Sequence, residues 1–242
     1  MWSWTTFLHY LQSSYMLQGA LITLGLSVAA MVLGLACGLV AALMRMSSNR
    51  FISGPARFYI WVMRGTPVLV QLIVIYTGLP QFGLRLGVLS SAIVGLGLNE
   101  GAYLAEIFRA GIMAVPRGQF EAAQALGLSH GKTMRLVVIP QALRVVVPPI
   151  GNTFNSLMKT SSLASVISMD ELLRRTEMLI QAQFRVLEIF ADAALYYLLM
   201  TTVWGFIQRW IEQRLARAET RRVPTDSLAD GAQTLTLSHD SA

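Results

Sequence analysis

Three polar residues stand on one face of an otherwise apolar segment. Asn99, Tyr103 and Glu106 fall at positions i, i+4 and i+7, a spacing that aligns them on a helix. A charge at bilayer depth costs about 2.5 to 3.5 kcal/mol on insertion scales, so this face should point into the protein. The pattern favours either a polar lining for a solute path or an ion pair of Glu106 with Arg109 that only positions helices. Glu100 lies off the face and is a weaker candidate for both roles.

A second polar group follows a pair of prolines. Pro148 and Pro149 remove two backbone donors, and we expect them to kink or interrupt their helix. An interruption inside a membrane is tolerated where it lines a cavity or where neighbours satisfy the backbone. The candidate pathway residues here are Asn152, Asn155, Thr160, Ser161 and Ser162, with Lys159 beside them. A static kink that lets helices pack is the alternative.

A third feature is the stretch GQFEAAQALGLSHGKTMRLVVIPQ, residues 118–141, which is helical in composition and lies between apolar segments. Pro116 suits a first helical turn, Gly127 can take the left-handed conformation that ends a helix, and Ser129 can cap the next helix. Small residues, Ala122, Ala123 and Ala125, allow close approach, and Glu121 offers one charge. The loop, about 115–139, is predicted to be a compact pair of helices that docks on another protein.

Other sites have little support. A pair of helices could in principle read DNA, but a loop tethered at both ends to membrane spans is poorly placed to enter a major groove. We therefore expect no nucleic-acid partner. The sequence GLSHGKT has Leu126 where a phosphate-binding loop needs glycine, so this chain should not bind ATP. His130 and His239 lack partners at metal-ligand spacing. No paired carboxylates or nucleophile constellation indicates an enzyme.

The composition predicts that these features belong to a membrane protein. The chain has 242 residues, 54% hydrophobic and 13% charged, with a mean hydropathy of +0.54. Apolar segments of spanning length cover about 17–43, 58–79, 88–113, 140–158 and 187–206. All should be helices, because an open sheet edge in lipid leaves backbone groups unsatisfied. Small residues in the first segment, such as Gly34 and Gly38, predict tight helix contacts. The expected fold is an all-α bundle of about five transmembrane helices.

The basic residues predict an orientation. With the N-terminus outside, five of the 19 lysines and arginines lie outside (Arg85, Lys159, Arg174, Arg175 and Arg185) and the others face the cytoplasm. Residues 1–16 carry no formal side-chain charge and form an extracytoplasmic or interfacial start rather than a cleavable signal peptide. Residues 17–215 form the membrane domain, and 216–242 read as a disordered cytoplasmic tail.

The motifs resemble a known family. Glu121-Ala122-Ala123, Gly127 and Val137-Val138-Ile139-Pro140 resemble the EAA loop of bacterial ABC importer permeases. Three further stretches resemble the polar amino-acid uptake subfamily: RGTPVLVQLIVIYTGLP (64–80), AYLAEIFRAGI (102–112) and VPRGQFEAAQALGLS (115–129). The resemblance runs over about residues 17–215.

The resemblance implies a type I importer permease in a bacterial inner membrane. A second permease subunit, identical or homologous, would complete the path, and a periplasmic binding protein would deliver a polar amino acid. Two cytoplasmic ATPase subunits would bind ATP and Mg²⁺ and dock on the EAA loop, through Glu121, Ala122, Ala123, Gly127 and Pro140. This chain itself would hold no cofactor.

One position departs from the subfamily. Lys-Asp-Thr-Ser-Leu is frequent there, whereas this chain has Lys159-Thr160-Ser161-Ser162-Leu163, which weakens a cationic-substrate assignment. Two alternatives to amino-acid import stay open. The same fold could import an opine or another amino-acid derivative, or the chain could be a membrane scaffold that recruits a partner without transport.

Overall fold

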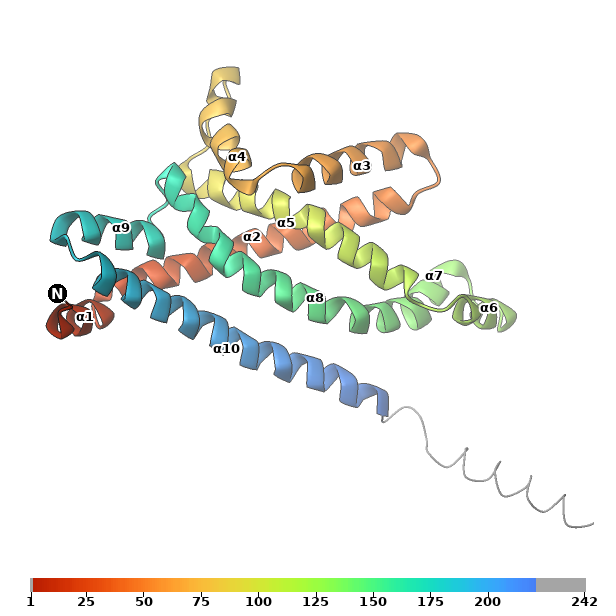
Figure 1. Ribbon diagram of the computed structural model, residues 1–242. Helices are drawn as coiled ribbons and strands as arrows, with labels where there is room; N and C mark the ends of the chain where they lie inside the picture. The colour runs from red at the N-terminus through yellow and green to blue at the C-terminus, as the bar shows by residue number, and fades with distance from the viewer. Residues whose placement is uncertain (1, 221–242) are drawn as a thin grey trace, which may run out of the picture.

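The fold is entirely helical over the described residues. The structure is a computed structural model that describes the backbone of residues 2–220 and the side chains of residues 2–215. Its α-helices are α1 (Trp4–Leu11), α2 (Ser14–Met46), α3 (Arg50–Gly65), α4 (Val68–Ile73), α5 (Val88–Met113), α6 (Arg117–Ala125), α7 (His130–Thr133), α8 (Ile139–Thr160), α9 (Leu172–Gln183) and α10 (Val186–Thr220). Short π-helical or 3₁₀ turns cover Val74–Gly78, Leu79–Phe82, Met134–Val138 and Ser161–Ile167. This confirms the predicted all-α bundle (Figure 1).

The described residues contain four helical segments long and apolar enough to cross a bilayer: Ser14–Met46, Val88–Met113, His130–Ile167 and Val186–Leu215. A bent pair, Arg50–Gly65 and Val68–Phe82, makes a fifth when counted as one span. The count agrees with the prediction, but a single helix over 58–79 was wrong, because the pair bends by 108° at Thr66 and Pro67. Proline lacks an amide hydrogen and disfavours helical geometry in the residue before it.

Glycines set the spacing of α2 and α5, which lie side by side. A Cβ atom at Gly38 would lie 2.8 Å from the carbonyl oxygen of Gly101, and one at Gly34 would lie 3.2 Å from that of Gly97. Small residues matter here because helices in lipid associate through close packing rather than through the hydrophobic effect. The predicted tight contact of the first span is confirmed, and it holds α5 and its polar residues against α2.

The expected interruption of the fourth span is wrong. Helix α8 runs unbroken through Pro148 and Pro149. Its neighbour α10 supports it at this point, since Trp204 Nε1 donates to the carbonyl of Gly151 over 2.8 Å and Gln208 Nε2 donates to that of Pro148 over 3.4 Å. The prolines remove the donors to the carbonyls four residues earlier, whereas the bonds from α10 reach carbonyls at and after the prolines. These bonds therefore join α8 to α10 and do not replace the lost ones.

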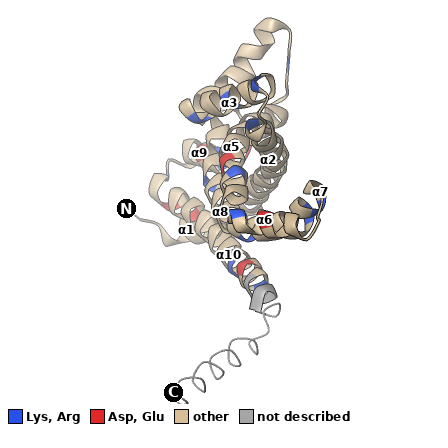
Figure 2. Cartoon of the chain, turned by 90° about the vertical axis from the view of Figure 1, so that its right-hand side faces the viewer, with Lys and Arg blue, Asp and Glu red and all other residues tan. Residues whose placement is uncertain are grey.

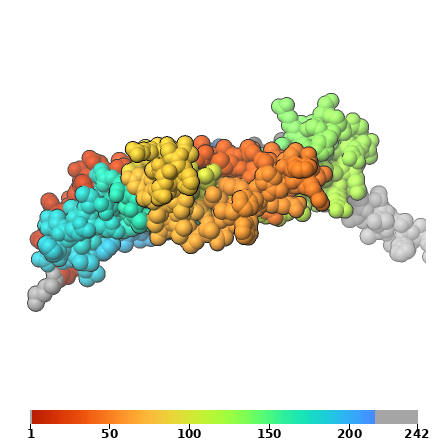
Figure 3. Space-filling model, turned by 90° about the horizontal axis from the view of Figure 1, so that it is seen from above, coloured from red at the N-terminus to blue at the C-terminus, as the bar shows by residue number. Residues whose placement is uncertain are grey.

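The two ends of the bundle differ. The α6–α7 pair projects at one end, whereas α1 and α9 lie at the other (Figures 1 and 3). The view onto the α6–α7 end shows basic residues on α3, α7 and α10 (Figure 2). The tail expected over 216–242 lies, beyond Thr220, outside the described residues.

Candidate functional site

A polar cavity of about 550 Å³ lies where the break between α3 and α4 meets α5 and α8. Its lining residues are Arg64, Thr66, Pro67, Val68, Asn99, Glu100, Tyr103, Glu106, Ile107, Thr153, Ser156 and Thr160. The cavity volume falls within the range of small-molecule sites. All four predicted residues of the third span are therefore brought together, including Glu100, which lies off the face formed by the other three.

Asn99 is held by the broken helix. Its Nδ2 donates to the carbonyl of Met63 over 2.9 Å and to Oε1 of Gln71 over 3.1 Å. Gln71 Nε2 in turn donates to Met63 O (2.9 Å), Thr66 O (3.1 Å) and Thr66 Oγ1 (2.8 Å). The break leaves carbonyls without helical partners, and these two amides satisfy them. Sequence reasoning missed Gln71; its signal was one amide within the apolar run VLVQLIVIY.

Glu106 sits between two arginines. Arg109 donates to its Oε2 through Nη2 over 3.0 Å and through Nε over 3.3 Å, and Arg45 of α2 contacts its Oε1. The predicted ion pair with Arg109 is present, and Glu106 also lines the cavity, so the two interpretations of this residue are compatible. Arg45 was missed because nothing in its local sequence indicates a partner on another helix.

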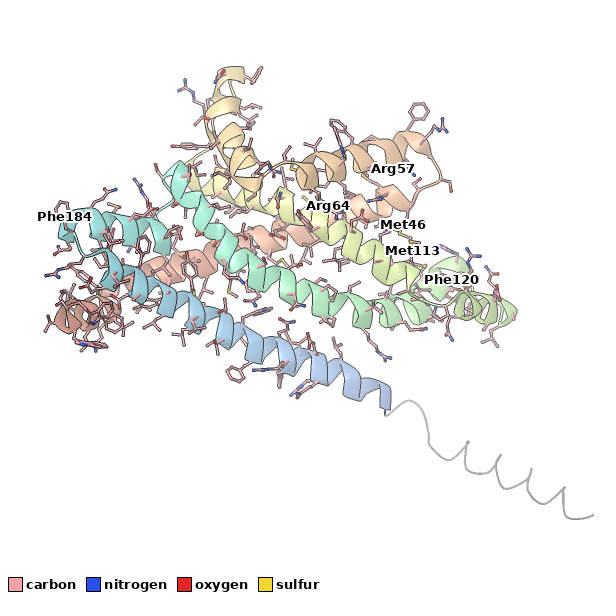
Figure 4. All side chains as sticks on the ribbon, viewed as in Figure 1. Met46, Arg57, Arg64, Met113, Phe120 and Phe184 are labelled. Atoms are coloured by element: carbon pink, nitrogen blue, oxygen red, sulfur yellow. The ribbon has the colours of Figure 1, made fainter. Side chains whose placement is uncertain are left out.

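Tyr103 and Arg64 form a further contact across the cavity. The guanidinium carbon of Arg64 lies 5.2 Å from the centre of the Tyr103 ring, within the range of cation–π attraction. Figure 4 shows Arg64 near the end of α3 that precedes the break. The cavity thus combines two carboxylates, one guanidinium, one amide and several hydroxyls, which suits a solute that carries both charges and hydrogen-bonding groups.

Helix α8 presents a different face from the one expected. Thr160 lines the cavity, together with Thr153 and Ser156, which the sequence analysis did not select. The other four candidates are absent from its lining: Asn152, Asn155, Ser161 and Ser162. Residues 153, 156 and 160 lie on one face of the helix. Because α8 is continuous, the residues between them lie on its other faces and not on the cavity.

Three of the four residues off the cavity make side-chain hydrogen bonds within the bundle. Asn152 accepts a hydrogen bond from Gln208 over 3.1 Å, Ser161 donates to the Met158 carbonyl over 3.0 Å, and Ser162 donates to the Lys159 carbonyl over 2.7 Å. The side-chain oxygen of Asn155 is buried and has no hydrogen-bond partner in the part of the chain that the structure describes.

The α6–α7 pair is a preformed knob. Gly127 has φ +73°, and after α6 the amide of Gly127 donates to Gln124 O (2.9 Å) and that of Leu128 to Ala123 O (3.0 Å). These two bonds form a Schellman motif, and the positive φ confirms the left-handed conformation predicted for Gly127. Pro116 precedes the first helical residue and Ser129 precedes α7, although Ser129 makes no side-chain cap bond.

The knob is anchored on one side and open on the other. Val115, Val138 and Ala142 form a buried cluster at its base, with Phe120 and Met134 packed against it. Pro140 stands in the first turn of α8, next to this cluster. Ala123 is buried, whereas Glu121 and Ala122 are exposed. One face of α6 is therefore free, and the other is fixed to the ends of the spans (Figure 4).

No group of three or more His, Cys, Asp or Glu residues within the described ranges is arranged to hold a metal ion.

Comparison with known proteins assigns the family. Residues 34–217 match the family model described as binding-protein-dependent transport system inner membrane component. The chain is 37% identical over 243 residues to an arginine transport system permease protein of Corynebacterium glutamicum, covering 94% of this chain and 77% of the relative. It is 40% identical over 238 residues to an octopine transport system permease protein of Rhizobium meliloti, covering 94% of both.

A solved structure agrees in fold. The crystal structure of an amino acid ABC transporter with histidines matches with a TM-score of 0.83 at 38% identity, covering 88% of this chain and 99% of that one. The bundle and the projecting knob described above are thus those of a type I importer permease. This chain belongs to the family of binding-protein-dependent transport system inner membrane components, the permease subunits of ABC transporters.

Proposed function

We propose that this chain is the permease subunit of an importer that takes up a polar amino acid delivered by a periplasmic binding protein. The observation that carries the proposal is the cavity of about 550 Å³, whose polar lining is assembled from three spans. Placing carboxylates and amides inside a membrane domain costs free energy, and such residues usually mark a solute path. Family membership and relatives named for arginine, glutamine and cystine transport support this substrate class.

The lining suggests how such a solute is held. Glu100 can attract the ammonium group and Arg64 the carboxylate, because opposite charges interact strongly away from bulk water. Asn99, Tyr103 and Thr160 can hydrogen-bond the side chain of the solute. Glu106 is already shared by two arginines, so its role is to hold α2 and α5 together at the cavity wall.

The knob is the proposed contact with the ATPase subunits. The exposed residues Glu121 and Ala122 would lie in a groove on a cytoplasmic ATPase, which binds ATP and Mg²⁺. The Gly127 turn and the cluster beneath α6 join this surface rigidly to α5 and α8, so movement of the ATPases would shift the walls of the cavity. A second permease subunit completes the path. The knob then faces the cytoplasm, and α1 and α9 face the periplasm of a bacterial inner membrane.

Import of an opine or another amino-acid derivative is the second candidate. The octopine transport relative is 40% identical and matches along 94% of this chain. Thr160 also lines the cavity without a charge, which relaxes the demand for a cationic solute.

Uptake by proteoliposomes tests the proposal. The permease is reconstituted with its ATPase and candidate binding protein, and radiolabelled amino acids and octopine are supplied with ATP on the cytoplasmic side. Ser156→Leu places a larger apolar side chain in the cavity and should abolish uptake. Ser162→Leu changes a residue outside the lining and should retain uptake. Equal uptake by both variants would contradict the assigned path.

A further inference from the structure

A second cavity adjoins the first. It has a volume of about 490 Å³ and is lined by Arg45, Arg57, Ile60, Trp61, Arg64, Gly65 and Tyr103. Arg64 and Tyr103 line both cavities, so their cation–π contact forms part of the wall between them. Arg57 precedes Arg64 by two turns of α3, and Figure 4 shows it on the knob side of Arg64. A solute that moved from the first cavity toward the knob would pass the Arg64–Tyr103 contact and enter the second cavity.

The charges of the two cavities differ. The first has two carboxylates, Glu100 and Glu106, and one guanidinium. The second has three guanidiniums and no carboxylate among its lining residues. The charged lining therefore changes from two carboxylates and one guanidinium to three guanidiniums at the shared wall.

Two of the three arginines have no internal counter-charge. Arg45 contacts Glu106, but neither Arg57 nor Arg64 forms an ion pair within the part of the chain that the structure describes. Like charges that share one cavity repel, and an oxyanion between them relieves the repulsion. Guanidinium groups bind carboxylates with two parallel hydrogen bonds, which favours a planar carboxylate as the ligand.

Arg64 can serve both cavities because it lines each of them. A carboxylate bound to Arg64 in the first cavity needs only to move past Tyr103 to reach Arg57. The ammonium group then leaves the negatively charged cavity behind.

We infer that the cavity of Arg45, Arg57 and Arg64 is a second solute site, which binds the carboxylate of the transported amino acid on the cytoplasmic side of the Arg64–Tyr103 contact. The inference rests on the proposed function and extends it, since it divides the path into two binding steps of opposite charge.

Binding to the complex of permease and ATPase in nanodiscs, without the binding protein, tests the inference. The probes are L-glutamine, L-glutamate and L-arginine, each compared with its α-carboxamide, and inorganic phosphate serves as competitor. Arg57→Gln is the test variant, because Arg57 lines only the second cavity. Arg50→Gln is the matched control, since Arg50 stands seven residues earlier on α3 and lines neither cavity.

Binding of a free amino acid to the unchanged complex should show two steps, one for each cavity. Arg57→Gln should weaken one of these steps about tenfold or more, the loss expected for a charge-assisted pair, and leave the other unchanged. Binding of the α-carboxamides should be weak in all forms, and Arg50→Gln should bind as the unchanged protein does. Arg57→Lys keeps the charge but loses the paired hydrogen bonds. Its affinity for the free amino acids should lie between those of Arg57→Gln and the unchanged protein, which would show that the loss in Arg57→Gln does not come from misfolding.

Two results would overturn the inference. One is a binding curve with a single step, or with two steps that Arg57→Gln leaves unchanged. The other is phosphate binding as tight as that of the amino acids, which would indicate a general anion site. Either result in a complex that still takes up an amino acid leaves the proposed function intact. Failure of the unchanged complex to take up any amino acid would instead refute the function itself.

Discussion

Replacing Gly38 by alanine tests whether the contact of α2 with α5 supports the site. The added Cβ would lie 2.8 Å from the carbonyl oxygen of Gly101 and 2.8 Å from Cβ of Leu104. Both distances are too short for a real Cβ atom, and a backbone oxygen cannot rotate away, so the helices must separate. Overpacking of this kind costs about 1 to 3 kcal/mol. The gain in helix propensity from glycine to alanine, about 1 kcal/mol in water, offsets part of this cost.

Gly25→Ala is the matched control on the same helix. A Cβ atom there meets nothing within 4 Å, so only the propensity gain applies. We therefore expect Gly38→Ala to be less stable than Gly25→Ala by about 1 to 3 kcal/mol. The free energy of unfolding is measured by titrating the purified chain from mild detergent into sodium dodecyl sulfate and following tryptophan fluorescence. Equal stability of the two variants would refute the inferred backbone contact.

Three further predictions concern other parts of the chain. Burial raises the pKa of the Glu171 carboxyl, which caps α9, from 4.5 to about 7 despite hydrogen bonds from Leu173 N and Arg174 N. The folded state thus retains a proton that the unfolded chain releases, so stability should fall by about 3 kcal/mol as the pH rises from 4.5 to above 7. Glu171→Gln should lose this dependence in pH-dependent melting, and an unchanged slope would exclude Glu171 as its source. Gln71→Leu should cost about 1 to 3 kcal/mol, because the Thr66 carbonyl loses its donor and Asn99 loses the Gln71 acceptor. The exposed Gln81→Leu should cost little, and equal melting temperatures of the two variants would count against this role. Glu121→Arg and Gly127→Trp should each abolish co-purification with the ATPase while membrane insertion persists, so recovery of an intact complex with either variant would rule out docking through α6.

Local sequence was sufficient for the elements whose structure depends on local chemistry. Helix α6 of the knob ends where Gly127 permits a positive φ, and the α2–α5 contact forms where Gly34 and Gly38 leave the backbone uncovered. The spacing of Asn99, Tyr103 and Glu106 also placed them on one cavity, because a helix fixes the direction of its own side chains.

Features that depend on contacts between distant segments were not predictable in the same way. Whether a proline ends a helix depends on its neighbours. Pro67 lies at a break where Gln71 and Asn99 bond the carbonyls of Thr66 and Met63, whereas Pro148 lies in a continuous helix that is bonded to α10. The face of α8 that lines the cavity follows from that continuity, which is why Thr153 and Ser156 replaced residues expected from polarity alone. The pairing of Arg45 with Glu106 likewise exists only once α2 lies against α5.

The central claim is that this chain carries an amino acid through a polar path under the control of a separate ATPase. The most direct test is ATP hydrolysis by the reconstituted complex of permease, ATPase and candidate binding protein, measured with cationic, anionic, neutral and derivatised amino acids. We expect one class to stimulate hydrolysis, and Ser156→Leu to uncouple that stimulation from uptake. Hydrolysis that no class stimulates, in a complex shown to be intact, would contradict import and favour a membrane scaffold that recruits its partner without transport.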